Sequence, residues 1–186
     1  MLRDDVELLQ HEWTDWSVLG TAMPLAVVAS EDQRFADHFG VDLKSIKKSL
    51  DEAEDGGRMR GASTISQQLA KNLFLSPSRS FMRKGIEAYL SVVIEICLPK
   101  RRILEIYVNI VELGPGIYGV GAASRQFFGK TPTMLTDSEA ALLAAILPNP
   151  IRLKAGAPSV YVRERQDWIV QQIQRLRREA WLTRLD

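Results

Sequence analysis

Hydroxyl and amide side chains, one lysine and no acid make up the polar part of residues 61–75, GASTISQQLAKNLFL. Ile65, Leu69 and Leu73 recur at i, i+4 and i+8, which predicts one apolar face of an amphipathic helix. The remaining positions carry Ser, Thr, Gln, Asn and Lys71, whereas a solvated helix face normally mixes charges of both signs. This composition favours a surface that hydrogen-bonds a polyhydroxy or anionic ligand.

Two acids, Glu31 and Asp32, come just before an aromatic ring and a histidine, Phe35 and His38. Ser30 fits a capping box with the glutamine three residues later, so we expect a helix to begin at Glu31. The dipole of such a helix would favour the ionised form of both acids. Acids are common at helix N-termini, and this local pattern alone therefore favours a structural role over a chemical one.

Several cations and one acid lie between residues 71 and 87, from the end of the first expected helix to the start of the next. Arg83 and Glu87 are spaced for an ordinary i,i+4 ion pair, worth a few tenths of a kcal/mol on a surface. Lys71, Arg79 and Lys84 lie close by in sequence, and cations that converge on a phosphate can stabilise its negative charge. The spacing leaves the ion pair and the phosphate site equally open.

Residues 114–119, GPGIYG, fit the dinucleotide-binding pattern G-x-G-x-x-G, and Asp137 follows near the place of a ribose-binding acid. That pattern binds nucleotides only after a strand and before a helix, within a βαβ unit. Here a helical pattern precedes it, so we interpret the glycines as a tight turn, with Gly114 ending a helix.

Composition excludes several other classes of function. The chain has 186 residues, enough for one domain, and its formal net charge of +1 gives no field that would attract nucleic acid. Cys97 is the only cysteine, so an internal disulfide and a cysteine-based zinc site are both excluded, and we expect it to be buried. His11 and His38 are the only histidines, which disfavours a multi-histidine metal site.

Helical patterns dominate the chain, and strand signals are weak throughout, which predicts a mainly α fold. Residues 51–61 are expected to form a surface loop. Thr136 with Glu139 forms a second capping-box pattern ahead of an apolar helix. The helices are expected over residues 43–51, 64–75, 83–98, 101–113, 140–147 and 159–182.

Two segments have features that suit either the protein interior or a membrane surface. Residues 13–28 are apolar and rich in tryptophan, as in a core segment or a patch at a bilayer interface. Residues 161–184 are rich in arginine, which favours a solvated helix face but also suits anionic lipid. The start of the chain lacks the apolar region of a secretory signal.

Taken together, these motifs resemble those of the peptidoglycan glycosyltransferase family, lysozyme-like transglycosylases that polymerise lipid II. Five family motifs occur in the family's order, over roughly residues 24–170. No transpeptidase-like segment follows, so the chain resembles the monofunctional type. The motifs are SEDQRFADHFG at 30–40, GASTISQQLAKNLFL at 61–75, RKGIEA at 83–88, ILEIYVN with GPGIYG and FFGK at 103–130, and ALLAAILPNP at 141–150.

The resemblance implies a single lysozyme-like domain over residues 1–186, with a head and a jaw lobe, and an enzyme of the hexosyltransferase class. It would join the acceptor GlcNAc 4-hydroxyl to C1 of lipid-linked MurNAc, with inversion and loss of undecaprenyl pyrophosphate. Glu31 would be the base, and Glu87 the second carboxylate, orienting cations or a divalent metal. The other implied site residues are Lys71, Arg79, Arg83, Ser63, Thr64, Gln67 and Gln68 for pyrophosphate or sugar, and Asp32, Phe35, His38 and Asn109 for shaping the site.

The resemblance also sets expectations about the setting of the reaction. No cofactor is obligatory, no metal ligands are expected from the protein, and Mg²⁺ or Mn²⁺ is allowed on the pyrophosphate. Lipid II, the growing glycan strand and a membrane surface would be the partners, together with cell-wall synthesis or division proteins, but no nucleic acid. The location would be the periplasm, at the outer face of the bacterial cytoplasmic (inner) membrane, and the family's N-terminal membrane helix is absent here, as in a truncated soluble form.

Two alternatives remain open at this point. A lysozyme-like muramidase, or lytic enzyme, would share the fold and the glutamate, but would not need the cations Lys71, Arg79 and Arg83 because its substrate carries no pyrophosphate. A non-catalytic cell-wall scaffold would need neither Glu31 nor Glu87. The presence of every catalytic residue type argues against the scaffold.

Overall fold

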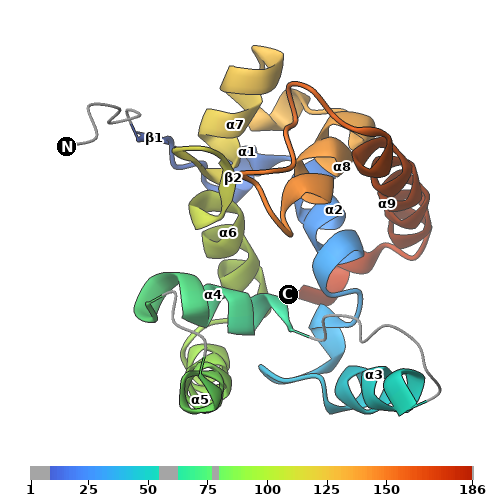
Figure 1. The fold of residues 1–186 in the computed structure, drawn as a ribbon. Coiled ribbons are helices and arrows are strands. Elements are labelled where there is room, and N and C mark those ends of the chain that lie inside the picture. The colour runs from blue at the N-terminus through green and yellow to red at the C-terminus, as the bar shows by residue number, and fades with distance from the viewer. Residues whose placement is uncertain (1–8, 55–62, 77–79, 186) are drawn as a thin grey trace, which may run out of the picture.

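The computed structural model describes residues 9–54, 63–76 and 80–185, and over these residues the chain is mainly helical, as the sequence predicts. Figure 1 shows α3, α4 and α5 at one end of the molecule and α2, α7, α8 and α9 towards the other. The elements in order are β1 (Gln10–His11), α1 (Trp16–Leu19), α2 (Ala22–Glu31), η1 (Phe35–Asp37), α3 (Leu43–Glu54), α4 (Ile65–Phe74), α5 (Phe81–Cys97), α6 (Lys100–Ile110), β2 (Glu112–Gly114), β3 (Ile117–Tyr118), α7 (Gly119–Phe128), η2 (Pro132–Met134), α8 (Asp137–Ile146), α9 (Val160–Arg178) and η3 (Trp181–Leu185).

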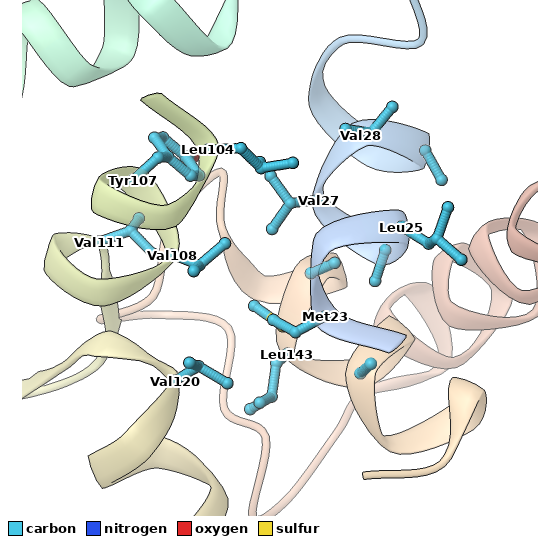
Figure 2. Packing of buried hydrophobic residues seen from close by; sticks show 14 of the residues in the cluster. Met23, Leu25, Val27, Val28, Leu104, Tyr107, Val108, Val111, Val120 and Leu143 are labelled. Carbon is cyan, nitrogen blue, oxygen red and sulfur yellow. The ribbon is translucent and has the colours of Figure 1, made fainter. Parts of the chain in front are cut away.

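Helix α2 is the centre of the hydrophobic core. Residues 22–29 of this helix are all buried, as expected for a helix that is apolar on every side. It packs against α8 and α9 on one side and α6 on another. Figure 2 shows Val27 directed towards Leu104 of α6, and Met23 beside Leu143 of α8. The core thereby fixes the end of α2, where Glu31 is the last helical residue.

The expected helix start at Glu31 is wrong, because the helix ends there instead. The Ser30 hydroxyl donates to the carbonyl of Val27 at 3.2 Å, and the Gln33 amide donates to the carbonyl of Ala29 at 3.2 Å. Both side chains therefore bond backwards into α2 and do not cap a following helix. The apolar run before Glu31 supplied the stronger helical signal, since it is buried on all sides.

The glycine-rich segment forms part of a small sheet and not a nucleotide-binding loop. Strands β2 and β3 pair antiparallel, and β1 pairs parallel with β3, giving the order β1-β3-β2. A hairpin of this kind is not a βαβ unit, which agrees with the rejection of dinucleotide binding. Gly114, however, ends strand β2, whereas the preceding helix α6 already ends at Ile110.

Other sequence expectations are mixed. Both helices with capping boxes at Thr64 and Thr136 begin as predicted, with α4 following the first and α8 following the second. Cys97 is exposed at the end of α5, so the expectation of a buried thiol is wrong. Helix α3 continues to Glu54, into the expected loop, and the rest of that loop lies outside the described residues.

The two segments that suited either the core or a membrane surface, residues 13–28 and 161–184, are each partly buried and partly exposed. Most apolar residues of the segment 13–28 are buried, whereas Trp13 and Val18 remain exposed. Helix α9 buries an apolar stripe that includes Ile169 and Ile173, and its arginines face outwards at its C-terminal end. Within the described ranges, no helix combines the length and apolar character needed to cross a bilayer.

Candidate active site

Glu31 lies at the junction of three helices, and its two carboxylate oxygens have different surroundings. Oε2 accepts a hydrogen bond from the Gln68 side-chain amide of α4 at 2.9 Å. Oε1 is buried and has no hydrogen-bond partner among the described residues, and the Arg165 guanidinium of α9 is 4.0 Å from it. The side chain is 13% exposed. The amide and the guanidinium stabilise its negative charge, which the C-terminal end of α2 by itself disfavours.

A buried tyrosine completes the hydrogen bonding of Gln68. The Tyr107 hydroxyl of α6 donates to Gln68 Oε1 at 2.8 Å. Burial, with the charge of Glu31 adding to it, raises the pKa of the Tyr107 hydroxyl well above its ordinary value. Tyr107 therefore keeps its proton at working pH and remains a donor to Gln68.

Asp32 ties the chain after Glu31 to the start of α4. Its Oδ2 accepts from the backbone N–H of Ile65 at 3.1 Å, and both its oxygens lie within 3.0 Å of His38 Nε2. Phe35 is fully buried and meets the His38 ring edge-on, with centroids 6.2 Å apart. The structure thus brings Asp32, Phe35 and His38 together next to Glu31, and through Asp32 they fix the start of α4 beside the site.

The first turn of α4 is fixed by its own capping box. The Thr64 hydroxyl accepts from the backbone N–H of Gln67, and Gln67 Oε1 accepts from the backbone N–H of Thr64, each at 3.1 Å. The Thr64 hydroxyl also donates to the carbonyl of Gly40 at 2.5 Å. The side chains of Thr64 and Gln67, which were expected to bind a ligand, therefore make hydrogen bonds that position α4 instead. Gln68 on the same helix contacts Glu31 directly.

A buried acid that the sequence did not single out joins α4 to α5. Glu95 Oε1 accepts from the Ser66 hydroxyl at 2.5 Å, from the Gly40 N–H at 3.1 Å and from the Lys100 amino group at 2.7 Å. The Lys100 amino group also lies 4.3 Å from the centre of the Phe35 ring. Periodicity gives no sign of such a cluster, because its members come from four separate parts of the chain.

Glu87 forms a second charged group on α5. It is 3% exposed, and its two oxygens bind the Arg83 guanidinium at 3.2 Å and the Lys84 amino group. Lys84 also donates to the Ser63 hydroxyl at 3.0 Å. The i,i+4 ion pair that the spacing allowed is present, and the buried Glu87 also holds Lys84. Phosphate binding by these cations stays a prediction.

One hollow contains Glu31 and extends as far as Ser63, next to the cations held by Glu87. Ser63 lines it together with Glu31, and Ser63 is also the residue that Lys84 contacts. Basic side chains of the neighbouring segment, among them Lys44 and Lys48, add positive charge to its wall. The residues that line the hollow are Glu31, Asp32, Gln33, Arg34, Asp42, Lys44, Ser45, Lys48, Ser63 and Thr64.

The remaining expected site residues lie in different places. Lys71 is exposed one turn beyond Gln68 on α4, and its side chain makes no ion pair or hydrogen bond with the described part of the chain. Arg79 lies outside the described residues. Asn109 is fully buried and exchanges hydrogen bonds with the backbone of Thr14, at 2.7 and 2.9 Å, so it anchors the N-terminal segment.

A base in a hollow with several cations suits transfer of a group from a phosphate to a hydroxyl. The base accepts the proton of the hydroxyl, and the cations stabilise the departing phosphate. Over the residues described, no three His, Cys, Asp or Glu side chains gather as metal ligands.

Comparison with known proteins gives consistent matches over most of the chain. Residues 4–174 match the family described as Transglycosylase. A biosynthetic peptidoglycan transglycosylase of Marinomonas sp. (strain MWYL1) is 54% identical over 168 residues, which is 90% of this chain and 75% of the relative. The protein of the same name from Citrobacter koseri is 50% identical over 185 residues, or 98% of this chain and 76% of the relative. That from Xanthomonas campestris pv. campestris (strain B100) is 52% identical, over 90% of this chain and 68% of the relative.

Proposed function

Because this chain belongs to the transglycosylase family, we propose that it is a peptidoglycan glycosyltransferase that polymerises lipid II into linear glycan strands. The observation that carries the proposal is the hollow lined by both Glu31 and Ser63, since Ser63 is held by the cation Lys84. A base and a phosphate-binding group are the two parts that this reaction requires.

In the proposed reaction, Glu31 accepts the proton of the acceptor GlcNAc 4-hydroxyl as the hydroxyl oxygen bonds to C1 of the lipid-linked MurNAc. The bond from C1 to the phosphate oxygen breaks on the opposite face, and its electron pair leaves with undecaprenyl pyrophosphate. The anomeric centre is inverted. Hydrogen bonding from Gln68 holds the carboxylate in place for proton transfer.

The cations supply the second requirement. Arg83 and Lys84 are held by the buried carboxylate of Glu87, so their charges are fixed before the pyrophosphate binds. The Lys71 side chain is exposed and has no ion-pair partner among the described residues, so it is free to contact a phosphate, and Arg79 is proposed to join it. Glu87 thereby acts by orienting the cations and not by transferring a proton.

A divalent cation is proposed to accompany the pyrophosphate and not to reside in the protein. Among the described residues, Glu87 is the only acid paired with Arg83 or Lys84, and both its oxygens already bind these cations. Glu87 could bind a metal ion only if Lys84 or Arg83 moved away from its carboxylate. Polymerisation rates with Mg²⁺, with Mn²⁺ and with a chelator measure this requirement directly.

The substrate also defines where the enzyme acts. Peptidoglycan is assembled outside the cytoplasm, and we propose that this chain works in the periplasm, at the outer face of the cytoplasmic membrane, on lipid II and the growing lipid-linked strand. Cell-wall synthesis or division proteins are proposed as further partners. Binding to vesicles with and without lipid II tests the membrane contact.

The experiment that separates synthesis from hydrolysis uses two substrates. The protein is incubated with lipid II and, in parallel, with finished peptidoglycan, and the products are analysed on gels. We expect glycan strands from lipid II and no soluble fragments from finished peptidoglycan. Release of muropeptides without strand formation would instead identify a lysozyme-like muramidase, and no reaction in either tube would identify a scaffold.

A further inference from the structure

Tyr107 lies in the core behind the site and reaches the base through one intervening side chain. It is 0% exposed, and its hydroxyl donates to Gln68, whose amide in turn donates to Glu31. The three residues come from α6, α4 and α2. We propose that Tyr107 is a positioning residue, which fixes the Gln68 amide so that this amide orients the carboxylate of the general base. This proposal rests on the function proposed above.

Tyr107 on one side of Gln68 and Glu31 on the other together determine which way the Gln68 amide points. A side-chain amide has an acceptor end and a donor end, and either could face Glu31. The negative carboxylate requires the donor end, and the protonated Tyr107 hydroxyl satisfies the acceptor end at 2.8 Å. A rotated amide would direct its oxygen at the carboxylate and leave two acceptors without a proton between them.

The bond from Gln68 restrains Glu31 more than any other polar contact. Among the described residues it is the only hydrogen bond to this carboxylate, because Oε1 has no partner and Arg165 is 4.0 Å away. Glu31 is also the last residue of α2, so no further helical turn confines it. Loss of the amide's orientation would therefore allow the carboxylate to turn away from its reactive position.

Tyr107 does not line the hollow, and it is not part of the ion-paired set Arg83, Lys84 and Glu87. Its removal should therefore affect the chemical step and leave donor binding unchanged, which a general loosening of the fold would not do. Tyr107→Phe deletes only the hydroxyl and keeps the buried ring. Tyr118→Phe is the matched control, because Tyr118 pairs with Glu112 across strands β2 and β3 and is not among the residues that line the hollow.

The first test compares steady-state polymerisation of lipid II. We expect Tyr107→Phe to lower kcat about tenfold, the effect of one well-placed hydrogen bond, with KM for lipid II unchanged. Tyr118→Phe should match the wild type in both constants. A Tyr107→Phe enzyme with unchanged kcat, or with a raised KM and unchanged kcat, would overturn the proposal.

A double-mutant cycle asks whether Tyr107 acts through Gln68. Gln68→Met keeps the length of the side chain but removes the amide. If the relay is correct, adding Tyr107→Phe to Gln68→Met lowers kcat no further. Multiplied losses in the double variant would show that Tyr107 acts by another route and would refute the relay.

A measurement independent of catalysis separates failure of the relay from failure of the proposed function. The Gln68 side-chain amide is assigned in a ¹⁵N NMR spectrum by its loss in Gln68→Met. Its signals should shift and exchange faster with solvent in Tyr107→Phe and stay unchanged in Tyr118→Phe. An unaltered Gln68 signal refutes the relay, even if the wild type proves inactive on lipid II.

Discussion

Asp32→Ala is expected to weaken both the fold and the site, because one carboxylate connects the segment after the base to helix α4. The substitution removes the hydrogen bond to the backbone N–H of Ile65 and both contacts with His38. A hydrogen bond to a charged group contributes about 1.5–3 kcal/mol, and an imidazole left without its partner costs about 1–3 kcal/mol more. The Asp32 and His38 side chains are 4% and 5% exposed, so water replaces little of this loss.

The sum is about 2.5 kcal/mol at the lower end of these ranges, which for a chain of this size lowers the midpoint of thermal unfolding by roughly 5–10 °C. Urea titration followed by circular dichroism measures the free energy, and calorimetry measures the midpoint. Asp15→Ala is the control: Asp15 is exposed, its side chain bonds only Trp13 among the described residues, and the substitution should shift the midpoint by no more than about 2 °C. A loss below about 1 kcal/mol in Asp32→Ala would refute the connecting role of this carboxylate.

Two further substitutions test the proposed phosphate-binding lysine and the electrostatics of a helix cap. Lys71→Ala should weaken binding of a pyrophosphate-bearing lipid roughly tenfold, since it removes an exposed cation without changing any described contact, and calorimetric titration showing equal affinity would exclude Lys71 as a ligand. Burial opposes the charge of Glu139, yet its pKa lies below the ordinary 4.5, because Lys130 and Thr136 bind the ionised form. Its stabilisation is therefore present above that ordinary value and lost as pH falls through the lowered one. Glu139→Gln should cost about 1 kcal/mol at neutral pH and progressively less below about pH 4, and a cost independent of pH would contradict this reasoning.

The sequence allowed good prediction of the elements whose signals are local. The capping boxes at Thr64 and Thr136 depend on residues only three positions apart, and both helices begin where those pairs indicate. The error at Glu31 has the same origin. Ser30 also fits a local capping pattern, but the apolar segment before it forms a helix because α6, α8 and α9 cover it on several sides. Burial on all sides is a property of the tertiary fold, which the pattern of one segment does not reveal.

The site was predictable to the extent that its residues lie in motifs. The resemblance identified Glu31, Asp32 and Gln68 as site residues, but it assigned Gln68 to phosphate or sugar, whereas the structure has its amide bonded to Glu31. The two helices that carry Glu31 and Gln68 are joined through Asp32. Tyr107 and Arg165 could not be assigned, since one reads as a core residue of α6 and the other as one of many arginines in α9. Their nearness to Glu31 depends on how helices distant in sequence pack together, and no spacing along the chain encodes it.

The rate of lipid II polymerisation by Glu31→Gln tests the central claim most directly. The substituted side chain can still accept a hydrogen bond from Gln68, so the fold and the binding of the donor should be retained. Because an amide cannot take the acceptor's proton, we predict a loss of about 10²–10⁴-fold in kcat, seen as the absence of glycan strands on a gel. Strand formation by Glu31→Gln at close to the wild-type rate would contradict the assignment of Glu31 as the base.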